Sequence, residues 1–361
     1  MPDKCFTEIQ NCLKNDEKEL SVVAMPDFFI DRLVNLDREA EAVCRNISEI
    51  VGHKGGSIDG AEQTELRGGN AVNTTCALAA LGVKVTPLVC TDELGLQLIT
   101  FFTRSNRVDL SHAKTFNNPS LTTALEFKTE DGRANVMLRD LGALTDFGPN
   151  DLNRRDYEAI ENADYVCVFN WAGTRRFGTE LAETVFRRTK TNGRGKTYYD
   201  TADPTPNREK IRELVNTVLK SENVDILSVN ENEAVCYAEQ LGLKTKANSR
   251  NVKFEELAMD AARFLAKHLN ARIDLHTTRF SATFRRKHET VVSAFDVPVL
   301  RATGAGDAWN AGNILGDAFK LSDECRLTLA NAVAACYISN RDGTHPTRMQ
   351  LTEFLTNAKT T

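Results

Sequence analysis

The sequence predicts an α/β fold: a doubly wound, mainly parallel three-layer α/β/α sandwich that carries a small β-rich lid. Four short apolar segments between residues 163 and 278 each adjoin a helical stretch. Strands that alternate with helices favour a parallel sheet covered on both faces. Between residues 121 and 140, apolar and polar residues alternate around an Asp-Gly turn, which indicates a hairpin with one wet face. A chain of 361 residues is long enough for one large domain with such an appendage.

Composition excludes several classes of protein. The net charge of −5 argues against general affinity for nucleic acid, which needs a basic surface. No apolar run approaches the length that spans a membrane, and residues 1–20 carry charges throughout, unlike a secretory signal. The nine cysteines form no CxxC pair and no zinc-like cluster, which is typical of free thiols in a cytosolic protein. We therefore expect a cytoplasmic protein without nucleic-acid or membrane partners.

The first part of the chain predicts four elements in order. Residues 1–20 have the pattern of a polar helical extension, and residues 20–24 form a short apolar strand that stops before Pro26. Residues 35–52 space their apolar side chains for one face of a helix. A glycine-rich loop follows over residues 52–60.

Residues 68–82 predict a glycine turn that runs into a buried helix of small residues, and residues 83–90 predict a strand. In open parallel sheets, ligands bind beyond the carboxyl ends of the strands, where a lid excludes water. We therefore assign the body that binds nucleotide and substrate to residues 1–31, 67–107 and 143–361. The lid over it is assigned to residues 32–66 and 108–142, and all of these bounds are approximate.

The stretch "VLRATGAGDAWNAGNILGDAF" (299–319) is the clearest functional signal. Gly304 and Gly306 allow bare backbone to approach a ligand closely at the start of a helix. The first N–H groups of a helix lack internal partners and favour an anion. Asp307 would repel that anion unless it takes a proton from the group that attacks it. The combination therefore indicates phosphoryl transfer.

Three more stretches accompany "ATGAGD" (302–307): "PDFFIDRLV" (26–34), "RGGNAVNTTCALAALG" (67–82) and "SVNENEA" (228–234). In this order and spacing the sequence resembles the ribokinase-like (phosphofructokinase-B type) family of sugar and nucleoside kinases, from about residue 20 to 347. The resemblance implies a kinase that uses ATP and Mg²⁺. It would transfer the γ-phosphate to a hydroxyl of a small polyhydroxylated substrate, which is a sugar, nucleoside or cyclitol.

The resemblance assigns Asp307 as the catalytic base and Gly304, Ala305 and Gly306 as the anion hole for the transferring phosphate. Taken alone, Asp307 is also a carboxylate at a helix N-terminus, worth about 0.5–1 kcal/mol to the helix.

Asp31 matches the aspartate that the family uses to bind two substrate hydroxyls. Gly68, Gly69 and Asn73 match the second motif, which contacts the substrate; alternatively, Asn73 caps the following helix.

Phe29 and Asn170 complete the residues expected at the substrate. Phe29 stands where many pentose kinases of the family carry asparagine. It either stacks on a base or an apolar sugar face, which favours a nucleoside or cyclitol, or only packs under the lid. Asn170 ends an apolar strand at the same sheet edge.

On the nucleotide side, Asn230 and Glu233 match the N-x-x-E motif that organises Mg²⁺ through water. The same two residues are also spaced for a capping box. Further positions that the resemblance assigns to the nucleotide are Thr278, Thr303, Asn331 and Gly343. Thr278 replaces a glycine that is typical of the nucleotide loop, which leaves the phosphate donor open.

Arg301 stands where potassium-activated relatives carry an aspartate that holds the ion. We therefore expect no dependence on a monovalent cation. Two alternatives to a kinase with an unphosphorylated acceptor remain. A phosphosugar kinase would need a basic pocket, for which Arg139 and Arg175 are candidates, and an inactive relative would only bind its ligand. The lid hairpin is a candidate surface for a homodimer, unless the insertion at 32–66 covers its edge.

Overall fold

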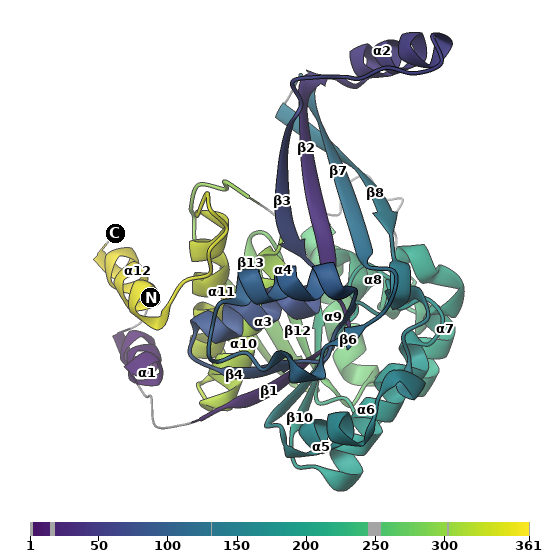
Figure 1. Cartoon of the computed structure of the whole chain (residues 1–361). Coiled ribbons are helices and arrows are strands. Elements are labelled where there is room, and N and C mark those ends of the chain that lie inside the picture. Colours follow the sequence, from purple (N-terminus) through teal and green to yellow (C-terminus); the bar gives the residue numbers. More distant parts are fainter. Residues whose placement is uncertain (1–2, 15–18, 131, 245–253, 302, 361) are drawn as a thin grey trace.

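The computed structural model describes residues 3–14, 19–130, 132–244, 254–301 and 303–360 (Figure 1). Its main sheet has the strand order β14-β13-β12-β11-β10-β9-β1-β4. The strands from β12 to β4 are parallel to one another, whereas β13 is antiparallel to both of its neighbours, β12 and β14. The strands of this sheet are β1 (Ser21–Met25), β4 (Lys84–Pro87), β9 (Tyr165–Phe169), β10 (Lys196–Asp200), β11 (Ile226–Val229), β12 (Arg272–His276), β13 (Phe280–Arg285) and β14 (His288–Ser293).

A second sheet forms the lid, which rises from one edge of the body (Figure 1). Its strand order is β3-β2-β7-β8. The strands are β2 (Phe29–Glu39), β3 (Glu62–Gly68), β7 (Ser120–Thr129) and β8 (Gly132–Asp140), and α2 (Ala40–Gly52) lies at the far tip. Two further short strands, β5 (Cys90–Thr91) and β6 (Lys114–Thr115), pair with each other.

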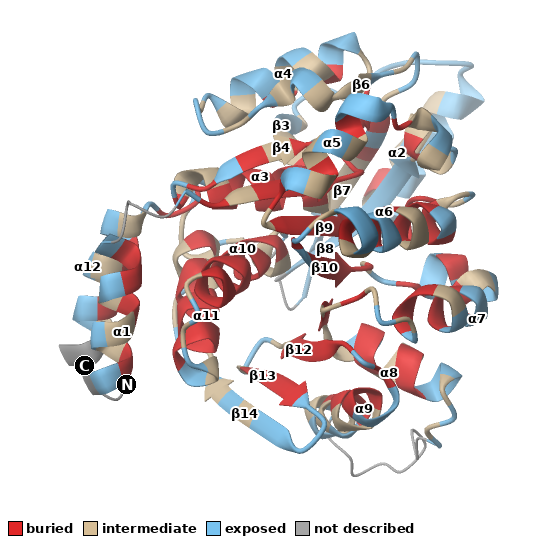
Figure 2. Ribbon diagram, turned by 90° about the horizontal axis from the view of Figure 1, so that it is seen from below, coloured by how far each residue is buried: buried red, intermediate tan, exposed pale blue. Residues whose placement is uncertain are grey.

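Helices cover both faces of the main sheet, and the buried residues concentrate between these layers (Figure 2). One layer contains α5 (Arg154–Asn162), α6 (Gly178–Asn192), α7 (Ile211–Leu214), α8 (Glu231–Gln240) and α9 (Phe254–His268). The other contains α1 (Asp3–Lys14), α3 (Asn70–Ala80), α4 (Glu93–Thr103), α10 (Ala305–Ala318), α11 (Asp323–Ile338) and α12 (Arg348–Thr360). No helix in the described ranges is both long and apolar enough to cross a bilayer.

These layers confirm the predicted α/β sandwich with a β lid. Strand β9 shows why the prediction worked: all five of its residues are buried, as in strands covered on both faces. The hairpin of β7 and β8 is also present, although Asp131 of its turn lies outside the described residues.

The prediction of a helix over residues 35–52 was partly wrong. Residues 35–39 continue β2, which pairs with β7 as far as Glu39, so helix α2 begins only at Ala40. Pairing between strands here overrides the local helical pattern. The N-terminal helix is less polar than expected, because Ile9 and Leu13 are buried where α1 meets α11 and α12.

Candidate active site

The candidate site lies at the carboxyl edge of the main sheet, as expected for a parallel α/β fold. Asp27 follows β1, Asn170 follows β9, Asp200 ends β10 and Asn230 follows β11. Because these strands are parallel neighbours, their polar ends gather at one edge, beneath the lid.

Helix α10 begins at this edge with the glycine-rich turn. Gly304 is the N-cap residue and has a φ of 87°, a left-handed conformation that favours glycine. A Cβ at Gly304 would lie 2.7 Å from Oη of Tyr337. The turn therefore needs glycine for both backbone conformation and space, and it presents the first N–H groups of α10 to the site.

The carboxylate of Asp307 is buried in the first turn of α10. It accepts hydrogen bonds from Nδ2 of Asn70 at 2.8 Å and Nδ2 of Asn73 at 2.9 Å. Burial raises the pKa of Asp307 to about 8; the negative charges of Asp200 and Asp27 also raise it, while the two amide hydrogen bonds oppose the shift. Asp307 thus combines a fixed orientation with a proton affinity suited to a base near neutral pH.

Asp27 fixes the start of α3, which supplies both of these amides. Its buried carboxylate accepts from the backbone N–H groups of Asn70 and Ala71, each at 2.9 Å, and from Nδ2 of Asn170 at 2.7 Å. Gly69 precedes the helix with a φ of 90°, and a Cβ there would lie 2.8 Å from the carbonyl oxygen of Asp27. Asp27 therefore satisfies the first N–H groups of α3, which the N-cap residue Gly69 cannot do because it has no side chain.

Sequence reasoning missed Asn70. It lies three residues before Asn73 on α3, and residues at this spacing share one face of a helix. That spacing within the "RGGNAVN" motif was the available signal.

A cavity of about 380 Å³ opens between the body and the lid, beside Asn70 and Asn73, whose amides bind Asp307. It is lined by several of the predicted site residues: Phe29, Asp31, Gly69, Asn73, Asn170 and Thr303. Oδ1 of Asp31 and Oδ1 of Asn73 are buried acceptors with no hydrogen-bond donor among the described residues. Burial raises the pKa of Asp31 to about 6 against the effect of a hydrogen bond from Thr122. Gly68 leaves room for this carboxylate, since a Cβ there would lie 2.1 Å from Oδ2.

Two of the lining residues have other contacts. Phe29 is buried, and the guanidinium carbon of Arg139 lies 5.1 Å from its ring centroid. Asn170 donates to Asp27, and its Oδ1 accepts from the backbone N–H of Gly173 at 3.0 Å. Asn170 is therefore held at the cavity wall by hydrogen bonds to Asp27 and Gly173. Arg175 donates to the carbonyl oxygen of Pro206 and does not line this cavity.

A second cavity, of about 270 Å³, lies on the other side of the glycine turn. Predicted site residues that line it are Asn230, Thr278, Ala305, Gly306 and Asn331. Trp309 and Phe295 make much of its wall apolar, which suits a planar base. Thr303 lines the first cavity instead, and Gly343 lines neither.

Asn230 and Glu233 form the capping box at the start of α8. The backbone N–H and Nδ2 of Asn230 donate to the Glu233 carboxylate at 2.9 and 2.8 Å, and the N–H of Glu233 donates to Oδ1 of Asn230 at 3.0 Å. Burial and the charge of Asp200 raise the pKa of Glu233 well above its usual value. Asp200, whose charge also raises the pKa of Asp307, was not singled out in the sequence, although it ends a buried strand at this edge.

Arg301 and Arg67 meet at the turn that contains Gly343. Nη2 of Arg67 donates to the carbonyl oxygen of Gly343 at 3.1 Å. A Cβ on Gly343 would lie 1.3 Å from Nη1 of Arg301, so this guanidinium rests directly on the glycine. The guanidinium carbon of Arg301 also lies 5.1 Å from the ring centroid of Tyr337. Arg301 and Arg67 both line the first cavity.

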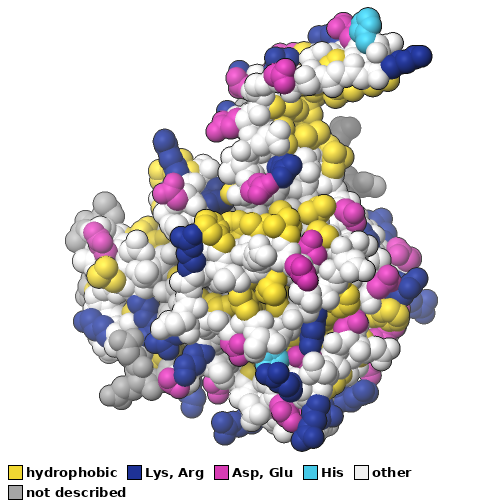
Figure 3. All heavy atoms as spheres, viewed as in Figure 1, with side chains coloured by type: hydrophobic (Ala, Val, Ile, Leu, Met, Phe, Trp, Pro, Cys, Tyr) yellow, Lys and Arg dark blue, Asp and Glu magenta, His cyan; other side chains and the backbone are white. Residues whose placement is uncertain are grey.

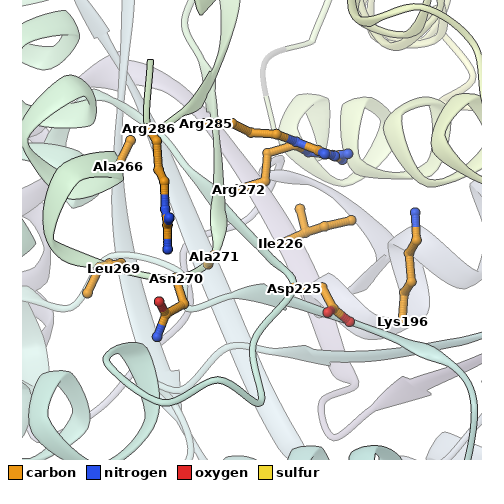
Figure 4. Close-up of a pocket in the computed structure, with 10 residues that line it drawn as sticks. All are labelled: Lys196, Asp225, Ile226, Ala266, Leu269, Asn270, Ala271, Arg272, Arg285 and Arg286. Atoms are coloured by element: carbon orange, nitrogen blue, oxygen red, sulfur yellow. The ribbon is translucent and has the colours of Figure 1, made fainter. Parts of the chain in front are cut away.

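Another cavity, of about 400 Å³, lies at the amino ends of the parallel strands, opposite the candidate site (Figure 4). Lys196, Arg272 and Arg286 are among its lining residues, and none of the predicted site residues is. Arg272 and Lys196 are paired with Asp317 there. Across the described residues, no group of three or more His, Cys, Asp or Glu side chains is arranged to hold a metal.

Comparison with solved structures finds the same fold over nearly the whole chain. Ribokinase from Cryptococcus neoformans var. grubii serotype A, in complex with ADP, matches with a TM-score of 0.68 at 16% identity, over 93% of this chain and 99% of that chain. Adenosine kinase from Sinorhizobium meliloti matches with a TM-score of 0.67 at 21% identity, over 94% and 99%. Arabidopsis thaliana ribokinase, complexed with ribose and ATP, matches with a TM-score of 0.67 at 20% identity, over 93% and 98%.

These likenesses confirm the ribokinase-like fold. A comparison with curated protein sequences finds no match. The model of the pfkB family carbohydrate kinases matches residues 39–349, which is most of the chain. The protein therefore belongs to the pfkB family of carbohydrate kinases, which are phosphotransferases with an alcohol group as acceptor.

Proposed function

We propose that the protein transfers the γ-phosphate of ATP to a hydroxyl of a polyhydroxylated acceptor bound in the 380 Å³ cavity. The observation that carries this proposal is the pair of buried acceptors, Oδ1 of Asp31 and Oδ1 of Asn73, which have no donor in the described chain. An unsatisfied buried acceptor is unfavourable, and acceptor hydroxyls would supply the missing hydrogen bonds. The orientation of the Asn73 amide is fixed, since its Nδ2 donates to the Asp307 carboxylate.

Asp307 acts as the base in this proposal. As the acceptor oxygen forms its bond to the γ-phosphorus, the bond from that phosphorus to the bridging oxygen of ADP breaks, and the acceptor proton passes to Asp307. The N–H groups at the start of α10 stabilise charge on the transferring phosphate. Closure of the lid, which carries Asp31, excludes water from the reaction.

The nucleotide occupies the 270 Å³ cavity, with its base against the apolar wall and its phosphates toward Gly306. Mg²⁺ would suit the buried carboxyl groups at the carboxyl edge of the main sheet, because the charge of Asp200 raises the pKa of both Glu233 and Asp307, and a cation would relieve this repulsion. Asp200 and Glu233 would hold the ion through water. The bound ion would supply positive charge that balances the phosphates.

A monovalent cation is not required in this proposal. The guanidinium groups of Arg301 and Arg67 already bring two positive charges to the turn at Gly343, and they would repel another cation. The nine cysteines form no disulfide in the described chain, which supports a reducing compartment such as the cytoplasm.

The test is release of ADP from ATP and Mg²⁺ with a panel of pentoses, hexoses, inositols, nucleosides and sugar phosphates. We expect turnover with one acceptor class and a loss of roughly 10²–10⁴ in kcat for Asp307→Asn. Asp31→Asn should mainly raise KM for the same acceptor. Turnover that survives unchanged in Asp307→Asn would refute the assignment of the base. Ligand binding without any ADP release would favour a protein that only binds its ligand.

A further inference from the structure

Two arginines of the acceptor cavity have no acidic partner in the part of the chain that the structure describes. Arg67 is on β3 of the lid, and Arg301 precedes α10. Nε of each is buried and makes no hydrogen bond. Because both guanidinium groups contact Gly343, the two positive charges are held close together.

Arg67 and Arg301 are half-buried with a buried Nε, and their environment differs from that of the fully buried arginines of the body. Arg272 pairs with Asp274 and Asp317, and Arg326 pairs with Asp274 at 3.1 Å. Burial of an arginine is unfavourable unless a carboxylate or another anion compensates it. The pair of Arg67 and Arg301 lacks that compensation within the described chain, and like charges at short range repel. Such a pair is suited to a ligand anion.

The neighbouring groups do not supply the missing negative charge. Tyr337 stacks on His345, and its pKa is raised by burial. Burial, with Arg67 and Arg301, lowers the pKa of His345 well below its usual value, so the imidazole is neutral at physiological pH. Asp31 and Asp307, the nearby acids of the site, have raised pKa values and face the hydroxyls and the reacting phosphate in the proposed function.

The position of the two arginines indicates whether their charge serves the acceptor or the nucleotide. Both arginines line the cavity that also contains Asp31 and Asn73. In contrast, no described residue that lines the nucleotide cavity is lysine or arginine. The uncompensated charge therefore belongs to the acceptor side of the site.

We propose that Arg67 and Arg301 form an anion subsite, and that the acceptor is a polyol that carries a phosphate monoester. This inference rests on the proposed function, and it names the acceptor class. The dianion binds between the two guanidinium groups while hydroxyls of the same molecule donate to Asp31 and Asn73. A free hydroxyl takes the γ-phosphate as described above, so the products are ADP and a bisphosphate. Arg139, which was one of the two arginines expected from the sequence, contributes at the rim of the cavity.

The first experiment compares matched acceptors: each neutral sugar or polyol, its phosphate monoester and its carboxylate. We expect kcat/KM to be highest for a phosphate monoester. Arg67→Ala and Arg301→Ala should each raise KM for that acceptor roughly tenfold to hundredfold, since each removes a charge-assisted contact. Their kcat should change little. Arg301→Lys keeps the charge and should recover part of the loss.

Arg286→Ala is the matched control. Arg286 is an exposed arginine of the distant cavity in Figure 4, so its removal changes net charge equally without touching the site. KM should not change in this variant. Thermal unfolding of each variant identifies any loss of activity that comes from misfolding.

Binding provides a readout that does not need turnover. Calorimetry should detect binding of the phosphate monoester to the Asp307→Asn variant. Binding to the double variant, Asp307→Asn with Arg67→Ala, should be weaker. If the wild type preferred neutral acceptors and Asp307→Asn abolished their turnover, the anion subsite would be overturned and the proposed function would stand. A preference for carboxylates would overturn the phosphate assignment. Absence of both ADP release and binding with every phosphate monoester would also overturn it.

Discussion

At the scale of single residues, the site places chemically useful side chains where burial opposes their charge. Asp307 is 5% exposed, and its ionised form is stabilised mainly by the amides of Asn70 and Asn73. Motif recognition found Asp307 and Asn73 because each belongs to a short characteristic stretch. It did not find Asp200, whose importance depends on elements that meet only in the folded chain, and it passed over Asn70 although the spacing from Asn73 was a signal.

The raised pKa of Asp307 makes stability depend on pH. The pKa of the Asp307 carboxyl is about 8 in the folded chain, whereas the ordinary pKa of aspartate is 3.8. Between these values the folded chain retains a proton that the unfolded chain releases, so the stability contributed by this group is complete below about pH 4 and is lost as pH rises towards 8. Asp307→Asn lacks this titration. We expect it to exceed wild type in unfolding free energy by at least about 1 kcal/mol at pH 8, and by much less at pH 5.

Urea unfolding of both proteins at several pH values measures this difference. In the same window, kcat/KM of wild type should rise with pH towards about 8, as the base loses its proton. A stability difference that is constant from pH 5 to pH 8 would contradict the raised pKa. A rate that falls with pH across this range would contradict the role of Asp307 as base.

At the scale of elements, the sequence predicted strands and helices best where burial is uniform. Strands β9 to β12 lie in the four apolar segments because both faces of each are covered. Residues 35–39 were misassigned because their place in β2 is set by β7, more than 80 residues later in the chain. The capping alternative for Asn230 and Glu233 is realised at α8, and it fixes the side chain of Asn230 at the wall of the 270 Å³ cavity.

The loop before α10 and the turn at Gly343 carry a prediction about monovalent cations. Arg301 stacks on Tyr337 and lies on Gly343, where Arg67 already occupies the carbonyl oxygen. A cation at this turn would meet two fixed positive charges. We therefore expect no severalfold rise in activity when K⁺ replaces a bulky organic cation at constant ionic strength. Such a rise would show that the arginines move aside for the ion.

At the scale of the whole molecule, the lid has two different faces. Asn135, Met137 and Arg139 of β8 line the 380 Å³ cavity. Val136 and Leu138 alternate with them, are 51% and 58% exposed, and pair across the hairpin with Leu125 and Thr123. Figure 3 shows hydrophobic side chains along the lid below α2. The helix of the 32–66 insertion lies at the tip of the lid, so it leaves this outer face uncovered (Figure 1).

We expect two copies of the chain to pair through these outer lid faces. Burial of Val136 and Leu138 from both copies would remove apolar area from water, and an edge strand such as β8 is a ready surface for association. Sedimentation should therefore give twice the chain mass of 40.1 kDa for wild type at micromolar concentration. Val136→Asp with Leu138→Asp should give a monomer, whereas Val291→Asp, at a similarly exposed position on β14, should remain a dimer. A monomeric wild type would contradict this assignment. A monomer produced equally by Val291→Asp would place the contact on the body instead, where β14 forms the edge of the main sheet.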